Sequence, residues 1–154
     1  MQITPPFGRL ITAMVTPFSK SGEIDWAGLE KIAAHLVSTG HDGIAVNGTT
    51  GEAPTTSDDE KDQIIKAVRK VVGDKIKIIA GAGNNETSHS VEQAQRAAKA
   101  GADGLLTKPN IRLPLVPNQT GSPAVAVDVS NPESRTPFCW NPMWLNGYVC
   151  QSAW

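Results

Sequence analysis

The sequence predicts an α/β fold in which short parallel strands alternate with helices. Two observations within residues 7–107 support this prediction. Short runs of β-branched and other apolar residues recur there, and each is followed by a longer segment whose apolar residues are spaced as on one face of a helix. About three and a half such units follow one another. Strands that are connected through helices form parallel sheets.

The first unit begins with a strand over residues 10–15, which is rich in β-forming residues and ends at Thr16 and Pro17. Asp25 is a suitable N-cap for the helix that follows, and Gly40 stands where a glycine commonly ends a helix. The apolar residues of this helix recur at the spacing of one helical face. They are Leu29, Ile32, Ala33, Leu36 and Val37.

The second unit has a short buried strand over residues 43–46 and a loop over residues 47–56. Ser57, followed three residues later by Glu60, predicts a capping box at the start of the next helix. The apolar stripe of this helix consists of Ile64, Ile65, Val68, Val71 and Val72.

The third unit has a strand over residues 76–80, a loop that contains glycine, and a helix from about residue 88 to residue 100. Gly101 ends that helix. Residues 104–107 then begin a fourth strand, so the regular alternation extends to residue 107.

The remaining residues, 108–154, have a different character. Seven of the eleven prolines lie within residues 109–142, and no amphipathic helix can run through them. One short strand is compatible with alternating valines, which are Val125, Val127 and Val129. We therefore expect residues 1–107 to form the α/β part and residues 108–154 to form an irregular, proline-rich tail.

This change of character falls inside a predicted strand, whereas domain boundaries ordinarily lie in exposed loops. It suggests a shifted reading frame, a misplaced coding end or a chimeric assembly. Reading the other two frames of the nucleotide sequence beyond Thr107 distinguishes the first of these from the others.

Composition excludes several classes of function. Fourteen basic and fifteen acidic residues give a net charge of -1, which offers no basis for binding nucleic acid or an anionic membrane. No apolar run approaches the roughly 18 residues of a membrane span, and the first residues do not resemble a signal peptide. A cytoplasmic protein is expected. The spacing of Cys139 and Cys150 indicates neither a metal site nor a structural disulfide.

The loop after the second strand carries the chemistry. Gly48 and Gly51 flank two hydroxyl side chains, Thr49 and Thr50. At the carboxyl end of a parallel strand, such glycines let the backbone present N–H groups to an anion, and the hydroxyls can bind a carboxylate or relay a proton. The alternative is a glycine-rich turn whose threonines serve only the next helix.

The surrounding sequence favours the catalytic interpretation. Residues 8–18, 42–52, 79–87 and 101–106 resemble, in order and spacing, the first four strands and the pyruvate-binding loop of dihydrodipicolinate synthases. These are Schiff-base aldolases with a (β/α)8 barrel, called a TIM barrel. The resemblance implies that residues 1–107 form the first three to four βα units of such a barrel, which is incomplete in this chain.

The resemblance also implies an activity. The family condenses pyruvate with an aldehyde, here aspartate semialdehyde, in lysine biosynthesis, without a cofactor or metal. A lysine forms a Schiff base with pyruvate. Thr49 would belong to a proton relay between two tyrosines, and Thr50 would hold the pyruvate carboxylate in a pocket shaped by Gly48 and Gly51. The wider family includes N-acetylneuraminate lyases and 2-keto-3-deoxy sugar acid aldolases. Its members are homo-oligomers, so we also expect self-association.

The sequence departs from the family pattern after Thr107. The expected Thr-Pro-Tyr-Tyr segment is replaced by Thr107-Lys108-Pro109, and Tyr148, the only tyrosine, lies in the tail. No position matches the Schiff-base lysine. Lys108 is not a convincing substitute, because half a barrel leaves both sheet edges and the inner face open, and the lysine needs burial to lower its pKa. We therefore expect an inactive chain, or a module that only binds an anionic metabolite such as pyruvate.

Other ionisable residues are interpreted structurally. His35 is expected to lie beside an apolar stripe, and His41 and His89 are expected to be solvated near helix ends. Glu52 is expected to be a loop carboxylate. The acidic run at residues 58–60 complements the helix dipole and does not indicate a metal site.

Overall fold

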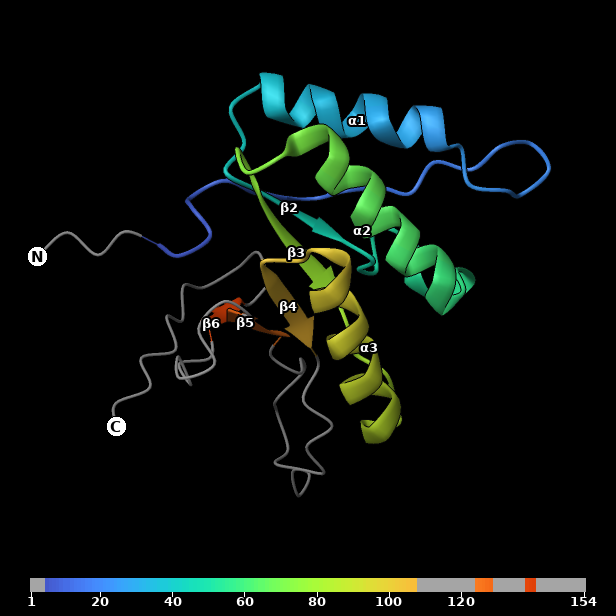
Figure 1. The fold of residues 1–154 in the computed structure, drawn as a ribbon, viewed down its shortest axis with the longest axis vertical. Coiled ribbons are helices and arrows are strands. Elements are labelled where there is room, and N and C mark those ends of the chain that lie inside the picture. Colours follow the sequence, from blue (N-terminus) through green and yellow to red (C-terminus); the bar gives the residue numbers. More distant parts are fainter. Residues whose placement is uncertain (1–4, 108–123, 129–137, 141–154) are drawn as a thin grey trace, which may run out of the picture.

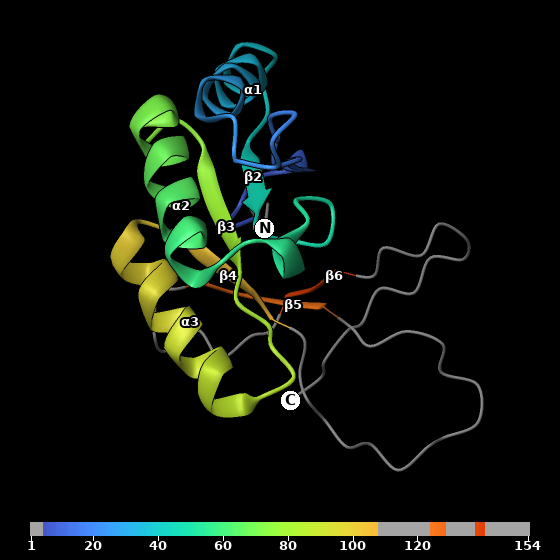
Figure 2. The same cartoon turned by 90° about the vertical axis from the view of Figure 1, so that its right-hand side faces the viewer.

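A computed structural model describes residues 5–107, 124–128 and 138–140. Its central feature is a sheet with the strand order β1-β2-β3-β4-β5-β6. The first four strands are parallel to one another, and three helices connect them in chain order. Figures 1 and 2 show all three helices on one face of this sheet. The predicted α/β class with parallel strands is confirmed.

Element bounds agree closely with the sequence prediction. The strands are β1 (Ile11–Ala13), β2 (Gly43–Val46), β3 (Lys77–Gly81), β4 (Gly104–Thr107), β5 (Ala124–Asp128) and β6 (Phe138–Trp140). The helices are α1 (Trp26–Ser38), α2 (Asp58–Val72), α3 (Thr87–Ala100) and the short 3-10 helix η1 (Ala53–Thr55).

The helix caps form as expected. The Asp25 side chain accepts a hydrogen bond from the Gly28 amide at 2.9 Å. Ser57 and Glu60 form the predicted capping box at the start of α2. Because these bonds satisfy amide groups that lack partners within the helix, each cap is worth about 1 kcal/mol.

The core lies between the sheet and the helices. The stripe residues of α1 and α2 are buried or half-buried there, and they pack against strand residues that alternate toward the same face. Its largest fully buried side chains are Leu29, Ile44, Val46, Ile64, Ile65, Val68, Val72 and Ile78. This alternation leaves the other strand residues for the opposite face, where Phe7 and Ile79 are buried and Ile11, Ala45 and Leu106 are half-buried against them.

One edge of the parallel sheet differs from the expectation. Half a barrel was predicted to leave both sheet edges open, but β5 pairs with β4 in antiparallel orientation, and β6 pairs with β5. The prediction of an open edge is therefore wrong at β4, because the backbone of β4 pairs with that of β5. β5 coincides with the strand expected from the alternating valines, whereas no strand was expected at β6.

The same short motif precedes both β2 and β4. Gly40 and Gly101 end α1 and α3 with left-handed backbones, at φ values of 81° and 106°. An aspartate follows two residues later in each case. The Asp42 carboxylate accepts hydrogen bonds from the Arg9 and Leu10 amides at 2.7 and 2.9 Å.

Asp103 binds more partners than Asp42 does. It accepts from the Ile78 amide at 2.8 Å, and it also pairs with Arg69 and with Lys77. In both copies of the motif, a carboxylate before one strand therefore holds the start of the preceding strand. This contact fixes the alignment of neighbouring strands at their amino ends.

The backbone carbonyl of Asn47 lies against Gly81 at the opposite ends of β2 and β3. A Cβ atom on Gly81 would stand 2.0 Å from that oxygen, which is far inside van der Waals contact. A side chain at position 81 would therefore displace the start of the loop that follows β2.

We predict that Asp103→Asn lowers the free energy of unfolding by about 2 kcal/mol at pH 7, because hydrogen bonds to a charged group are lost. Burial raises the pKa of Asp103, but hydrogen bonds from Ile78, Arg69 and Lys77 outweigh burial and hold the pKa below its usual range. A carboxylate with a lowered pKa stabilises the fold above its unfolded pKa of about 3.9 and loses this effect as the pH falls through the folded pKa.

The difference between wild type and Asp103→Asn should therefore be constant near neutral pH and shrink below about pH 4. Urea titrations at a series of pH values measure it. Asp74→Asn is the matched control, since Asp74 is exposed and makes no side-chain hydrogen bond or ion pair with the described residues. An equal effect of both substitutions would contradict the assigned role of Asp103.

We also predict that Gly81→Ala destabilises the chain by about 1–3 kcal/mol, because the added methyl group overlaps the Asn47 carbonyl. Gly48→Ala is the control from the same region, since its Cβ would meet nothing within 4 Å. Thermal unfolding of the two variants compares them. Similar melting temperatures would show that the close contact at Gly81 does not constrain the fold.

Candidate functional site

The candidate site is the loop from Asn47 to Thr56, which follows β2 at the carboxyl end of the parallel strands. Asn47 turns the chain out of the strand with a left-handed backbone at φ 55°. The turn continues with hydrogen bonds from the Gly51 and Ala53 amides to the Gly48 carbonyl, at 3.1 and 3.2 Å. The loop then passes through η1 into α2.

Two contacts hold the start and the middle of this loop. At its start, the Asn47 side chain donates to the Lys61 carbonyl in α2 at 3.1 Å. Further on, the buried Thr16 hydroxyl donates to the Gly51 carbonyl at 2.8 Å. Thr16 lies three residues after the end of β1, so the loop is held by the segment that follows a neighbouring strand as well as by the next helix.

Thr49 and Thr50 lie between these anchors, and both are exposed. Within the described part of the chain, neither hydroxyl makes a hydrogen bond, and neither amide donates to a backbone carbonyl. Gly48 is half-buried and Gly51 is buried. The loop therefore presents two hydroxyl groups and two amide groups that have no partner among the described residues.

Glu52 lies in the same loop but has a backbone role. It adopts a left-handed conformation at φ 53°, and its carbonyl accepts from the Thr55 amide and hydroxyl at 2.9 and 2.8 Å. Its exposed side chain agrees with the expected loop carboxylate. Lys108 and Tyr148 lie outside the described residues, as does Cys150.

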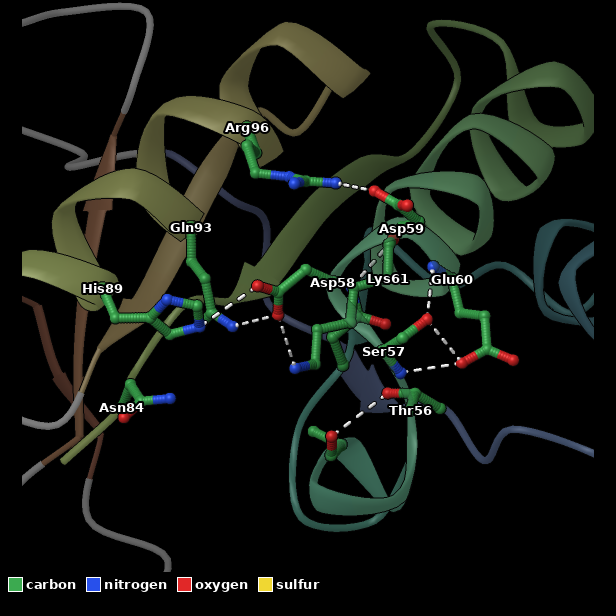
Figure 3. Close-up of polar contacts among 12 residues, drawn as sticks. Thr56, Ser57, Asp58, Asp59, Glu60, Lys61, Asn84, His89, Gln93 and Arg96 are labelled. Carbon is green, nitrogen blue, oxygen red and sulfur yellow. Dashed lines mark hydrogen bonds and ion pairs between the residues drawn. The ribbon is translucent and has the colours of Figure 1, made fainter. Parts of the chain in front are cut away.

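A polar network next to the loop was not predicted from the sequence. Figure 3 shows that side chains of α2 and α3 point toward one another next to this loop. Asp58 contacts His89 at 3.1 Å, Gln93 at 2.8 Å and Lys61 at 3.2 Å. Burial raises the pKa of Asp58, but hydrogen bonds from Gln93 and Lys61 outweigh burial and hold the pKa below its usual range.

Arg96 extends the network, since it pairs with both Asp59 and Asp62. The acidic run at the start of α2 therefore does more than complement the helix dipole, because Asp58 and Asp59 also bind α3. The expectation of a merely solvated His89 is wrong for the same reason. Helical spacing was the available signal, since residues 89, 93 and 96 share one face of α3.

The other histidines have local partners or none. The His41 ring Nδ1 lies 3.1 Å from the Leu36 carbonyl and 3.0 Å from the Thr39 hydroxyl, so it helps to close the end of α1. The His35 side chain is exposed. Among the described residues, no group of three or more histidine, cysteine, aspartate or glutamate side chains is arranged to hold a metal ion. No helix in these residues has the length and hydrophobicity needed to cross a bilayer.

Comparison with known proteins identifies relatives of this arrangement. The 4-hydroxy-tetrahydrodipicolinate synthase of Acidothermus cellulolyticus is 54% identical over 101 residues, which are 66% of this chain and 33% of that protein. A similar synthase of Streptomyces coelicolor is also 54% identical, over 66% of this chain and 34% of that protein. The chain thus spans about a third of the length of the curated relatives it matches.

Solved structures agree with these relatives. The dihydrodipicolinate synthase of Acinetobacter baumannii, solved in complex with pyruvate, matches with a TM-score of 0.63 and 42% identity, over 64% of this chain and 34% of that one. The α/β part described above thus corresponds to the amino-terminal part of a barrel. The model of the Dihydrodipicolinate synthetase family matches residues 6–109, about two-thirds of the sequence, and the chain therefore belongs to this family.

Proposed function

We propose that residues 1–107 carry the pyruvate-carboxylate loop of a 4-hydroxy-tetrahydrodipicolinate synthase, a lyase of lysine biosynthesis in the cytoplasm. The observation that carries this proposal is the exposed pair Thr49 and Thr50, with hydroxyl and amide groups that bind nothing else in the described chain. The pyruvate complex of the Acinetobacter baumannii relative supports the choice of substrate.

The residues of the loop would act in different ways. Thr50 and the loop amides would bind the pyruvate carboxylate, because N–H and O–H donors that lack other partners stabilise an anion without rearrangement. In a synthase that forms the imine, the residue at the position of Thr49 would pass protons to and from it. Gly48 and Gly51 would let the backbone approach the ligand. Aspartate semialdehyde would be the second substrate, and the active form would be a homo-oligomer.

Schiff-base formation needs a nucleophilic lysine. The resemblance to the family identifies no such lysine among the 154 residues. We therefore propose that this chain binds pyruvate without forming a Schiff base. Such a chain is a non-catalytic module for an anionic metabolite, which is the second candidate function, and the tyrosine-free sequence at Thr107-Lys108-Pro109 favours it. We further propose that the sequence of residues 108–154 does not follow the family, as a shifted reading frame would produce.

The first test concerns covalent capture. The purified chain is incubated with pyruvate and borohydride, and its intact mass is measured beside a full-length synthase that forms the adduct. We expect no adduct on this chain. A single reduced pyruvate adduct on one lysine, Lys108 for example, would show that the chain has its own nucleophile and would refute the second candidate function.

The second test concerns binding. We predict that Thr50→Val weakens pyruvate binding about tenfold, because a hydrogen bond to a charged group contributes about 1.5 kcal/mol. Thr49→Val is the matched control, since it makes the same change at the neighbouring exposed residue but affects only the proposed relay. Amide chemical shifts of residues 48–51, followed during pyruvate titration, give both affinities.

Equal weakening by the two substitutions would contradict the separate roles of Thr49 and Thr50. Shifts elsewhere in the chain, with none in the loop, would contradict the proposed pyruvate site altogether.

A further inference from the structure

A small cavity lies behind the candidate loop, where the end of β2 faces the first two turns of α2 and the middle of α3. Asn47, Asp58, Lys61, Asp62, Gln93 and Arg96 are among the residues that line it. The cavity measures about 10 Å³. This is close to the smallest space that holds one water molecule, and it excludes a metabolite.

Asn47 lines this cavity, and its side-chain acceptor atom is buried. Asn47 is 5% exposed, and its Nδ2 donates to the Lys61 carbonyl at 3.1 Å. This bond fixes the orientation of the amide, because the opposite orientation would place two oxygen atoms against each other. Oδ1 then has no hydrogen-bond partner among the described residues. A buried acceptor without a partner is unfavourable, so the geometry calls for a donor at this point.

The charges around the cavity determine which kind of group can donate a hydrogen bond to Asn47 Oδ1. Two carboxylates and two cations already pair there, since Lys61 lies 3.2 Å from Asp58 and Arg96 donates to Asp62 at 2.9 Å. A further cation would meet two positive charges, and an anion could not donate to Oδ1. A water molecule can donate to Oδ1 and accept from the Lys61 ammonium, which has three N–H groups.

We propose that one ordered water molecule occupies this cavity and donates a hydrogen bond to Asn47 Oδ1. The water connects the left-handed turn after β2 to the polar network between α2 and α3 that Figure 3 displays. It thus supplements the direct bond between Asn47 and the Lys61 carbonyl. This inference does not depend on the proposed function, because it concerns the support behind the loop and not its exposed hydroxyls.

A crystal structure of the 154-residue chain tests the proposal directly. The expected result is a water oxygen within about 2.7–3.2 Å of Asn47 Oδ1. In solution, water–protein cross-relaxation should show a long-lived water at the Asn47 side-chain amide protons. A metal ion at this position, a Lys61 ammonium bonded directly to Oδ1, or an empty cavity would each overturn the proposal.

Two variants separate the water from a rearranged lysine. Asn47→Gly keeps a residue that adopts positive φ but removes the acceptor, and oxygen-17 relaxation dispersion should count one long-lived water fewer. Lys61→Met keeps most of the side-chain volume and removes the ammonium, and the water signal at Asn47 should persist. If Lys61→Met removes that signal, or if Asn47→Gly leaves the water count unchanged, the proposal fails. Should Asn47→Gly not fold, the wild-type crystal structure alone decides.

Discussion

The conformation of the candidate loop depends on the close approach of the Asn47 carbonyl to Gly81. This contact is possible only because β2 and β3 run in parallel and end together, so that Val46 lies opposite Ala80 and the next residues meet. An asparagine tolerates the left-handed backbone that the turn needs, and a glycine tolerates the carbonyl beside it. The exposure of Thr49 and Thr50 follows from this turn, because the chain leaves the sheet before it reaches them.

The amino ends and the carboxyl ends of the parallel strands have different roles. At the amino ends, Asp42 and Asp103 accept hydrogen bonds from amides next to or within the neighbouring strands, and Asp103 also pairs with Arg69 of α2. At the carboxyl ends, the polar groups of the loop remain available. Barrel enzymes place their active sites at the carboxyl ends of strands and their stabilising contacts at the amino ends. The separation is already present in these few βα units.

Most of the fold could be predicted from the sequence because its signals are local. The caps at Asp25 and Ser57 and the left-handed glycine at Gly101 each depend on a few adjacent residues, and the helical stripes depend on a single period. The parallel orientation of the first four strands followed from their helical connections.

The features that were not predicted depend on contacts between distant segments. The pairing of β5 with β4 joins residues about twenty positions apart in antiparallel orientation, and the first part of the chain contains no signal for it. The contact of Asp58 with His89 needs the packing of α2 against α3, which single-helix periodicity does not specify. For the candidate site, the sequence indicated the four loop residues, whose role stays a prediction. It did not indicate the anchors at Thr16 and Gly81, since each is an isolated residue whose contact forms only in three dimensions.

Binding and chemistry place different demands on this fold. The anchors of the loop come from the segment after β1, from β3 and from α2, so the geometry of the proposed carboxylate site arises within consecutive units. A Schiff-base lysine needs more, because its amine must be buried to lose its proton near neutral pH. That burial requires a closed pocket around the inner face of the sheet, where Ile11, Ala45 and Leu106 are still half-exposed. Under the proposed function, the segment therefore binds an anion without the covalent step.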